Sequence, residues 1–280
     1  MTARLSDVVA HIDNVRQLGA VVVAMRGIAA SHAQQSRGLL SAIESYSEIV
    51  ARTIGAALRL APPDWDVAGH PPARGSTALI LFCAEGGFCG DLSDRVLDAV
   101  RSELETSVVF EIGTRGATIA EEHGIRLDWT TAMANQIGAV PAVAERVAQA
   151  LYAGIAAGRF LRADVIYPRP SGAAIAIERL SLVPLDVRQF LSKEKSQPPL
   201  AGLPFEVLIE QMAAEYVYAL LCSTAMHTFV AENEARMAAM AAARDHIDDT
   251  LATLVMREHQ ARQEEITSEI VELSSAIMMR

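Results

Sequence analysis

The chain has 280 residues, of which 51% are hydrophobic, so it can bury a sizeable core and is not disordered. Its net charge of −10 excludes the basic surface with which proteins bind nucleic acids. Three cysteines without paired spacing predict reduced thiols in a cytosolic setting. No run of 18 uncharged apolar residues and no secretory leader is found, so membrane contact is expected only through partners.

The first 60 residues contain no proline and carry a helical pattern. Apolar residues recur there at spacings of three and four, namely at Leu5, Val8, Ile12, Val15, Leu18, Val22 and Met25. This spacing predicts a long helix over residues 1–60 with one apolar stripe. Its glycines each weaken it by about 1 kcal/mol relative to alanine, so the helix needs a partner to be stable.

The Pro- and Gly-rich segment 61–76 predicts a boundary, after which the pattern changes to short elements. Apolar runs predict strands at 78–83, 107–112, 125–131, 164–167 and 173–183. Helices are predicted between them at 91–105, 117–124 and 141–158. Strands that alternate with helices predict a small α/β, Rossmann-like domain over 77–190, with a mostly parallel sheet covered on both faces.

The last 76 residues, 205–280, contain neither glycine nor proline. Nearly all of this segment is predicted to be helical, and an unbroken helix of that length would reach about 110 Å. Its apolar stripe, from Leu208 to Ile277, matches that of the first helix. The two terminal helices are therefore expected to form an antiparallel coiled coil, with the α/β domain inserted between them.

A glycine-rich turn, Glu85 to Gly90, lies between the first predicted strand and a helix. Such a turn can cradle a phosphate, which would make the chain a nucleotide-binding α/β enzyme. The spacing does not match the dinucleotide fingerprint, however, and a P-loop lysine is absent. A tight turn that needs positive φ is the favoured interpretation. Cys83 and Cys89 form a poor zinc pattern, and Cys89 is expected to be a small buried residue.

Two stretches of the last helix have unusual compositions. The alanine-rich stretch 235–243 predicts a slim helix that a partner can approach closely, with Met237 and Met240 in the core. Polar residues nearly encircle the helix over 257–267. They form either a solvated face or a surface that meets a partner, where Arg262 would bind a carboxylate with Gln263 and Thr267 nearby.

Four stretches of the chain also resemble the motifs of one known family. Ala24-Met-Arg-Gly-Ile-Ala-Ala-Ser31 looks like the family's A-M-x-M-V-A-A-S, and Gly87-Phe-Cys-Gly90 is similar to its G-L-C-G turn. Ala235-Arg-Met-Ala-Ala-Met240 resembles A-R-M-x-A-M, and Ala261-Arg-Gln-Glu-Glu-Ile-Thr-Ser-Glu-Ile270 looks like A-R-Q-x-x-I-T-x-E-I. In this order, and with the helix–α/β–helix layout, they resemble the gamma subunit of F-type rotary ATP synthases.

The resemblance implies a non-catalytic central-stalk rotor that couples ion flow through a membrane ring to ATP synthesis or hydrolysis on the beta subunits. The paired helices would form an axle inside a ring of alpha and beta subunits. The α/β domain would lie against the epsilon subunit and the c-subunit ring. The complex would be peripheral, on the cytoplasmic side of the inner membrane. Neither a catalytic residue nor a metal or cofactor is expected on this chain.

The resemblance also assigns roles to residues by their positions in the motifs. Arg262, Gln263, Thr267 and Glu269 match the region that touches a loop of the beta subunit. Met25 and Arg236 match positions near the lower bearing.

The chain departs from the family pattern on its first helix. The family is usually rich in lysine there, whereas this chain has Arg16-Gln-Leu-Gly-Ala-Val-Val-Val23. That departure predicts a divergent branch, such as an alternate ATPase beside a standard one. A coiled-coil adaptor unrelated to ATP is the other alternative, but it does not account for the four motifs.

Overall fold

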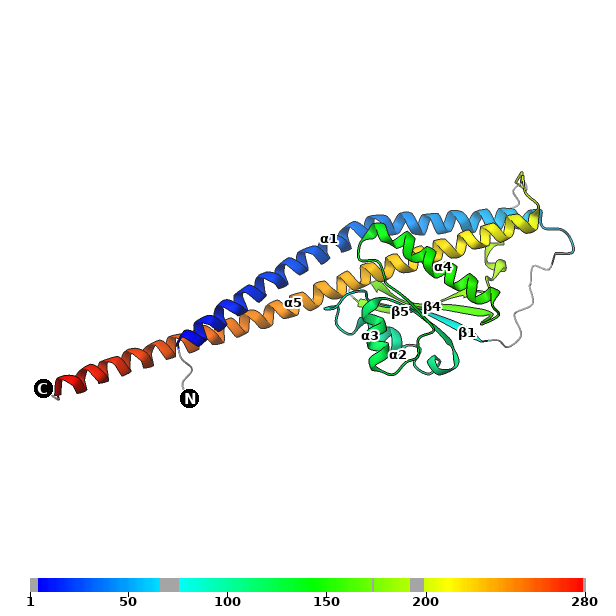
Figure 1. The fold of residues 1–280 in the computed structure, drawn as a ribbon. Coiled ribbons are helices and arrows are strands. Elements are labelled where there is room, and N and C mark those ends of the chain that lie inside the picture. The colour runs from blue at the N-terminus through cyan, green and yellow to red at the C-terminus, as the bar shows by residue number, and fades with distance from the viewer. Residues whose placement is uncertain (1–4, 66–75, 173, 192–198, 279–280) are drawn as a thin grey trace. The chain divides into compact units, whose positions relative to one another are not determined.

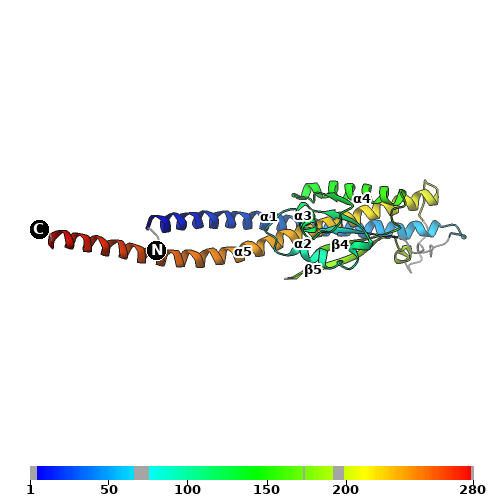
Figure 2. The ribbon, with the colours of Figure 1, turned by 60° about the horizontal axis from the view of Figure 1, so that its bottom comes forward.

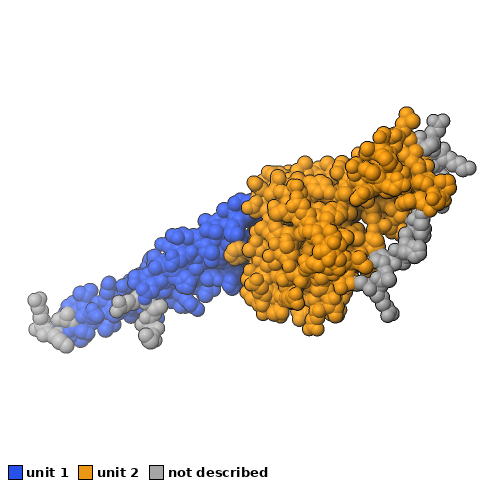
Figure 3. Space-filling view, turned by 45° about the vertical axis from the view of Figure 1, so that its right-hand side comes forward, with its two compact units in different colours: residues 1–30, 236–280 blue, residues 31–235 orange. Residues whose placement is uncertain are grey.

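The computed structural model describes residues 5–65, 76–172, 174–191 and 199–278. The helices are α1 (Leu5–Ala57), α2 (Leu92–Asp98), α3 (Thr114–Glu122), α4 (Val140–Ala156) and α5 (Phe205–Met278). The strands are β1 (Thr77–Phe82), β2 (Val108–Ile112), β3 (Trp129–Thr131), β4 (Arg162–Ser171) and β5 (Ala174–Val183). Contacts divide the chain into two units, residues 1–30 with 236–280 and residues 31–235, which Figure 3 shows in different colours.

The sheet of the second unit has the strand order β3-β2-β1-β4-β5. Strand β1 pairs in parallel with β2 and β4, and β2 pairs in parallel with β3. Strand β5 is antiparallel to β4. The expectation of a mostly parallel sheet between two long helices is therefore confirmed.

The sheet of this unit lies between α4 and α5 on one side and α2 and α3 on the other (Figure 1), and alternate residues of β1 face these two layers. Ile80 and Phe82 belong to a buried cluster with α4 and the first part of α5. Leu79 and Leu81 belong to a second cluster with α2 and α3. The predicted cover on both faces is thus present, and α5 itself supplies part of it.

Prolines explain why the sequence predicted too short a strand for β4. We expected residues 164–167, whereas the strand extends to Ser171 and includes Pro168 and Pro170. The pairing of β4 with β1 ends at Ile166, so both prolines lie where β4 pairs only with β5. A proline is tolerated in a strand where one side needs no ladder donor.

The predicted and observed bounds of α3 also differ, and a glycine is the reason. The helix was expected from Ala117, but it begins at Thr114 and includes Gly116. A Cβ at Gly116 would collide with the side chains of Glu111 and Cys83, so this glycine permits close packing of α3 on the sheet. Two other elements are shorter than expected: α2 ends at Asp98, and β3 comprises only three residues.

In the second unit, α1 and α5 run side by side and antiparallel, as both Figure 1 and Figure 2 show. Ile54 and Phe205 share one buried cluster. Polar contacts also join the two helices. Arg37 pairs with Glu234, Tyr46 donates to Glu215, and His227 Nε2 lies 3.3 Å from Glu44 Oε1.

In the first unit, the same two helices pair through apolar residues. Val8 and Ile12 cluster with Leu254, and Val22 clusters with Met240 and Ile247, which makes the pairing antiparallel as expected. The predicted place of Met240 in the core is confirmed, since it is 3% exposed.

Two parts of the predicted stripes were wrong. The last members of the α5 stripe, Ile266, Ile270, Leu273 and Ile277, are exposed rather than packed on α1. On α1, one residue was misplaced. Leu18 is 54% exposed, and the neighbouring Gly19 is buried instead. A Cβ at Gly19 would lie 3.4 Å from Ile247 Cγ2. The inward positions Val8, Ile12, Val15, Gly19 and Val22 alternate spacings of four and three. The predicted stripe instead took two consecutive spacings of three, from Ile12 to Leu18, which moved it off the contact line.

Helix α1 is long and apolar enough to cross a membrane when judged by length and composition alone, contrary to the expectation above. A packed helix of a soluble protein passes the same test. Only 22% of the qualifying window is buried, and Val21, Val23 and Ile28 of α1 are among the exposed apolar residues. Most of this apolar surface is thus not used within the chain.

Candidate functional site

The glycine-rich turn after β1 is closed by a carboxylate of the chain itself. The backbone N–H of Glu85 donates to Glu232 Oε2 at 2.9 Å, and the N–H of Gly86 donates to Glu232 Oε1 at 3.1 Å. Glu232 lies on α5 and is 4% exposed. In α/β folds, phosphates bind to backbone N–H groups at this end of a strand. Because Glu232 accepts from both of these N–H groups, neither of them is free to bind a nucleotide phosphate.

The side chain of Glu85 holds the same turn from the other direction. Its carboxylate accepts hydrogen bonds from the Thr114 N–H at 3.0 Å, the Thr114 hydroxyl at 2.8 Å and the Met133 N–H at 2.7 Å. Three loops at the carboxyl edge of the sheet are thereby joined. The expected positive φ occurs at Gly90, but also at Phe88, whose side chain is exposed. Cys89 is buried, as predicted.

A second buried carboxyl group, that of Glu111, lies on β2, one residue before the end of the strand. The side chain is 0% exposed, and neither carboxyl oxygen has a hydrogen-bond partner of normal geometry among the described residues. Burial raises the pKa of Glu111 well above its usual range, and the neighbouring Cys83 thiol offsets this only in part. Burial therefore favours the protonated, neutral form of Glu111 in the folded chain.

We expect the stability of Glu111→Gln relative to the unsubstituted chain to increase as pH rises above the usual pKa of a glutamate. Below a pH of about 4.5 both states bind the proton, so pH has no effect through this group. Above it, the unfolded state ionises while the folded state keeps the proton. The free energy of unfolding then falls by about 1.4 kcal/mol per pH unit until the folded pKa is reached. The substitution removes this loss, which urea denaturation of both chains across the pH range would measure.

The control for this experiment is Glu121→Gln, on the exposed surface of α3. Its unfolding curve should stay parallel to that of the unsubstituted chain at every pH. If Glu111→Gln gave the same parallel curves, the buried carboxyl group would be ionised in the fold and the interpretation would be wrong.

The polar segment near the end of α5 lies on an exposed surface. Every described side chain from Arg262 to Met278 is exposed. Arg262 Nη2 lies 2.8 Å from Glu258 Oε1, and the Thr267 hydroxyl donates to the Gln263 carbonyl at 2.8 Å. Glu269, seven residues after Arg262, falls on nearly the same side of the helix.

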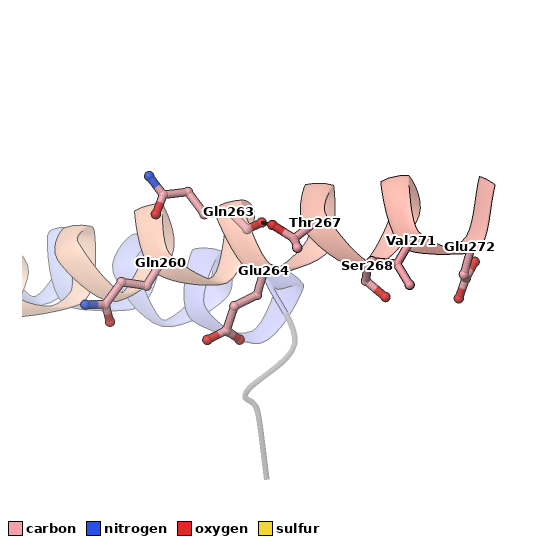
Figure 4. Close-up of a pocket in the computed structure, with 7 residues that line it drawn as sticks. All are labelled: Gln260, Gln263, Glu264, Thr267, Ser268, Val271 and Glu272. Atoms are coloured by element: carbon pink, nitrogen blue, oxygen red, sulfur yellow. Dashed lines mark hydrogen bonds between the residues drawn. The ribbon is translucent and has the colours of Figure 1, made fainter. Parts of the chain in front are cut away.

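Gln263 and Thr267 line a shallow open groove along this part of α5 (Figure 4). Its lining comes from successive turns of the one helix, namely Gln260, Gln263, Glu264, Thr267, Ser268, Val271 and Glu272. A groove that a single helix forms encloses no substrate. It suits contact with another protein chain, to which amide, hydroxyl and carboxylate groups offer hydrogen bonds.

The two residues assigned to the lower bearing lie in the first unit. Met25 is half-buried and packs beside Val22 and Met240, so much of its side chain belongs to the coiled-coil core. Arg236 is also half-buried. The structure thus brings the predicted residues to two separate places on the terminal helices.

Sequence reasoning missed Glu232 as a functional residue. The available signal was an acid followed by an amide, Glu232 and Asn233, directly after the apolar run Phe229 to Ala231. Both side chains are almost fully buried, and the Asn233 amide donates to the Phe229 carbonyl at 2.8 Å. A buried polar pair in an apolar stretch indicates that each has a specific partner.

Comparison with known proteins identifies the family. The family model described as ATP synthase matches residues 4–278. The ATP synthase gamma chain of Ruminococcus albus is 24% identical over 283 residues, covering 98% of each chain. The ATP synthase gamma chain of Polaromonas naphthalenivorans is also 24% identical, covering 94% of this chain and 93% of its own.

Solved structures share the fold. The rotor of the Euglena gracilis mitochondrial ATP synthase has a TM-score of 0.61 at 14% identity, covering 94% of this chain and 98% of its own. The central stalk and c-ring structure from Tetrahymena thermophila contains a chain with a TM-score of 0.57 at 15% identity, covering 80% of this chain and 99% of its own. The chain described here therefore belongs to the ATP synthase gamma family, whose members are non-catalytic central-stalk rotor subunits.

Proposed function

We propose that this subunit couples ion flow through a membrane ring of c subunits to ATP synthesis or hydrolysis on beta subunits. The observation that carries the proposal is the continuity of α5. This single helix of 74 residues includes residues that pack on the sheet of the second unit and residues whose side chains are exposed at its end. An unbroken helix transmits rotation between partners bound at its two ends, since no glycine or proline provides a hinge.

The exposed apolar residues of α1 support a partner that surrounds the paired helices. Leu18, Val21 and Ile28 are each more than half exposed. Exposed apolar side chains at helical spacing of this kind suit an interface with another chain. We infer that alpha and beta subunits cover it, while the α/β domain contacts an epsilon subunit and the c ring. The assembly would lie on the cytoplasmic side of the membrane and be attached through these partners.

The residues predicted for these contacts keep their roles in the proposal. Arg262, Gln263, Thr267 and Glu269 would meet a loop of the beta subunit, and their exposure leaves them accessible. Met25 and Arg236 would lie at the lower bearing. A rotor of this kind acts by presenting different contacts to each beta subunit, because only differential contact shifts a conformational equilibrium.

Isolation of the native complex tests the proposal. We expect the chain to co-purify with alpha, beta and c subunits in an assembly that hydrolyses ATP, with activity assayed in sodium and in sodium-free buffer. A chain that purifies alone would overturn it.

Calorimetry tests the alternative of a nucleotide-binding enzyme. The full chain should show no saturable binding of ATP or NAD, because Glu232 already accepts the hydrogen bonds of the turn. Saturable binding would favour the nucleotide enzyme instead.

A further inference from the structure

Three successive backbone N–H groups after β1 all donate to side-chain oxygens. The N–H of Ala84 donates to Ser93 Oγ at 3.2 Å, and those of Glu85 and Gly86 donate to the Glu232 carboxylate. The N–H groups of Glu85 and Gly86 converge on one carboxylate, as successive N–H groups do in a nest, which is a recognised site for anions. In this chain the anion comes from α5, 146 residues after Gly86 in the sequence.

The surroundings of Glu232 make these hydrogen bonds necessary. The nearby cluster is apolar and includes Ala84, Cys89 and Leu92, with Ile175 and Ala235 packed against it. An ionised carboxylate in such surroundings is strongly destabilising unless it is hydrogen-bonded. The two N–H donors provide this, one to each oxygen. Glu232 is therefore placed as a ligand rather than as a surface acid.

The turn also forms hydrogen bonds to the loops after β2 and β3. Through its carboxylate, Glu85 binds the first residue of α3 and the Met133 N–H that follows β3. A continuous series of hydrogen bonds thus leads from α5 through the turn to the loops at the edge of the sheet. Apolar packing between α5 and the sheet can slide, whereas a bidentate hydrogen-bonded carboxylate sets one position.

We propose that the turn at Glu85 and Gly86 is an anion-binding site whose built-in ligand is Glu232, and that this joint locks α5 to the sheet. Removal of the carboxylate should leave a vacant site that a small free carboxylate such as acetate can fill. The mechanical consequence rests on the proposed function: in a rotor, the joint would make α5 and the α/β domain turn together. The anion site itself is independent of that function.

The decisive experiment compares Glu232→Ala with Glu234→Ala in the full chain. Both residues lie on α5, but Glu234 pairs with the exposed Arg37 instead of the turn. We expect Glu232→Ala to lower the thermal midpoint and to speed hydrogen exchange at the Glu85 and Gly86 amides by about tenfold or more. Sodium acetate should restore both, relative to sodium chloride at equal ionic strength. Glu234→Ala and the unsubstituted chain should not respond to acetate.

Two results would overturn the site: unchanged exchange at both amides in Glu232→Ala, or an acetate effect equal to that of chloride. If Glu232→Ala does not fold, Glu232→Gln keeps the shape without the charge. It should still show faster exchange at one or both amides, and normal exchange there would count against the proposal.

The rotor consequence has its own measurement, in the assembled complex. Glu232→Ala should lower ATP-driven ion transport several-fold more than ATP hydrolysis. Glu234→Ala should leave the ratio of ion transport to hydrolysis unchanged. If acetate rescue is observed but the ratio is unaffected, the anion site is retained and its role in coupling is rejected. If no complex forms with the unsubstituted chain, the proposed function fails while the exchange result still decides the site.

Discussion

Replacing Ala242 by proline is expected to abolish coupling in the assembled complex. Ala242 is exposed in the middle of α5, so a larger side chain can be accommodated there. Proline, however, removes the backbone N–H that bonds to the Ala238 carbonyl, and its ring clashes with that turn. The cost in a helix interior is about 3 kcal/mol or more. The helix would kink or break, and rotation at one end would no longer reach the other.

The measurement is the ratio of ATP-driven ion transport to ATP hydrolysis in membranes that contain the complex. Ala242→Gln is the matched control, because it adds bulk while keeping the N–H and a good helix propensity. We expect it to behave like the unsubstituted chain. Ala242→Gly should fall between the two, since glycine costs about 1 kcal/mol without removing a hydrogen bond. Normal coupling in Ala242→Pro would show that an unbroken α5 is not required.

Simultaneous alanine substitution of Arg262 and Gln263 is expected to reduce ATP turnover or assembly by about tenfold, which corresponds to the loss of a charge-assisted hydrogen bond to a partner. Both side chains are exposed. Within the described residues, Arg262 forms an ion pair only with Glu258, one turn away on the same helix. Exposed pairs of this type contribute only about 0.3–0.5 kcal/mol. The stability of the chain itself should therefore change little.

Circular dichroism separates the two explanations of this segment. Helical content should stay the same in the double variant while turnover falls. The control pair is Arg101→Ala with Gln149→Ala, which removes the same chemical groups from exposed positions of the α/β domain. It should leave beta-subunit turnover intact. Unchanged turnover in the Arg262 and Gln263 variant would mean that the polar segment is a solvated face.

Much of the fold could be predicted because it depends on local properties of the chain. The absence of glycine and proline after Phe205 permits one continuous helix, and α5 ends at Met278, close to the end of that segment. Alternation of apolar runs and helical segments predicted the mostly parallel sheet. The errors occurred where packing overrides local preference. Gly116 is helical because its lack of a side chain lets α3 approach Cys83.

The residues of the candidate site also differ in whether a local pattern could reveal them. Arg262 and Gln263 were predicted as contact residues from the sequence, because an encircling polar segment on a helix is a local pattern. Glu232 was not, since its partners Glu85 and Gly86 are 147 and 146 residues away and no local pattern links them.

By itself, the sequence determined the order and approximate positions of the helices and strands and that two long helices enclose an α/β domain. Both follow from the periodicity of apolar side chains and from backbone freedom, which neighbouring residues control. Only the tertiary structure decided that α5 covers one face of the sheet and that its Glu232 fills the glycine-rich turn. A buried carboxylate is stable only where distant backbone donors converge on it, and that convergence exists only once the chain has folded.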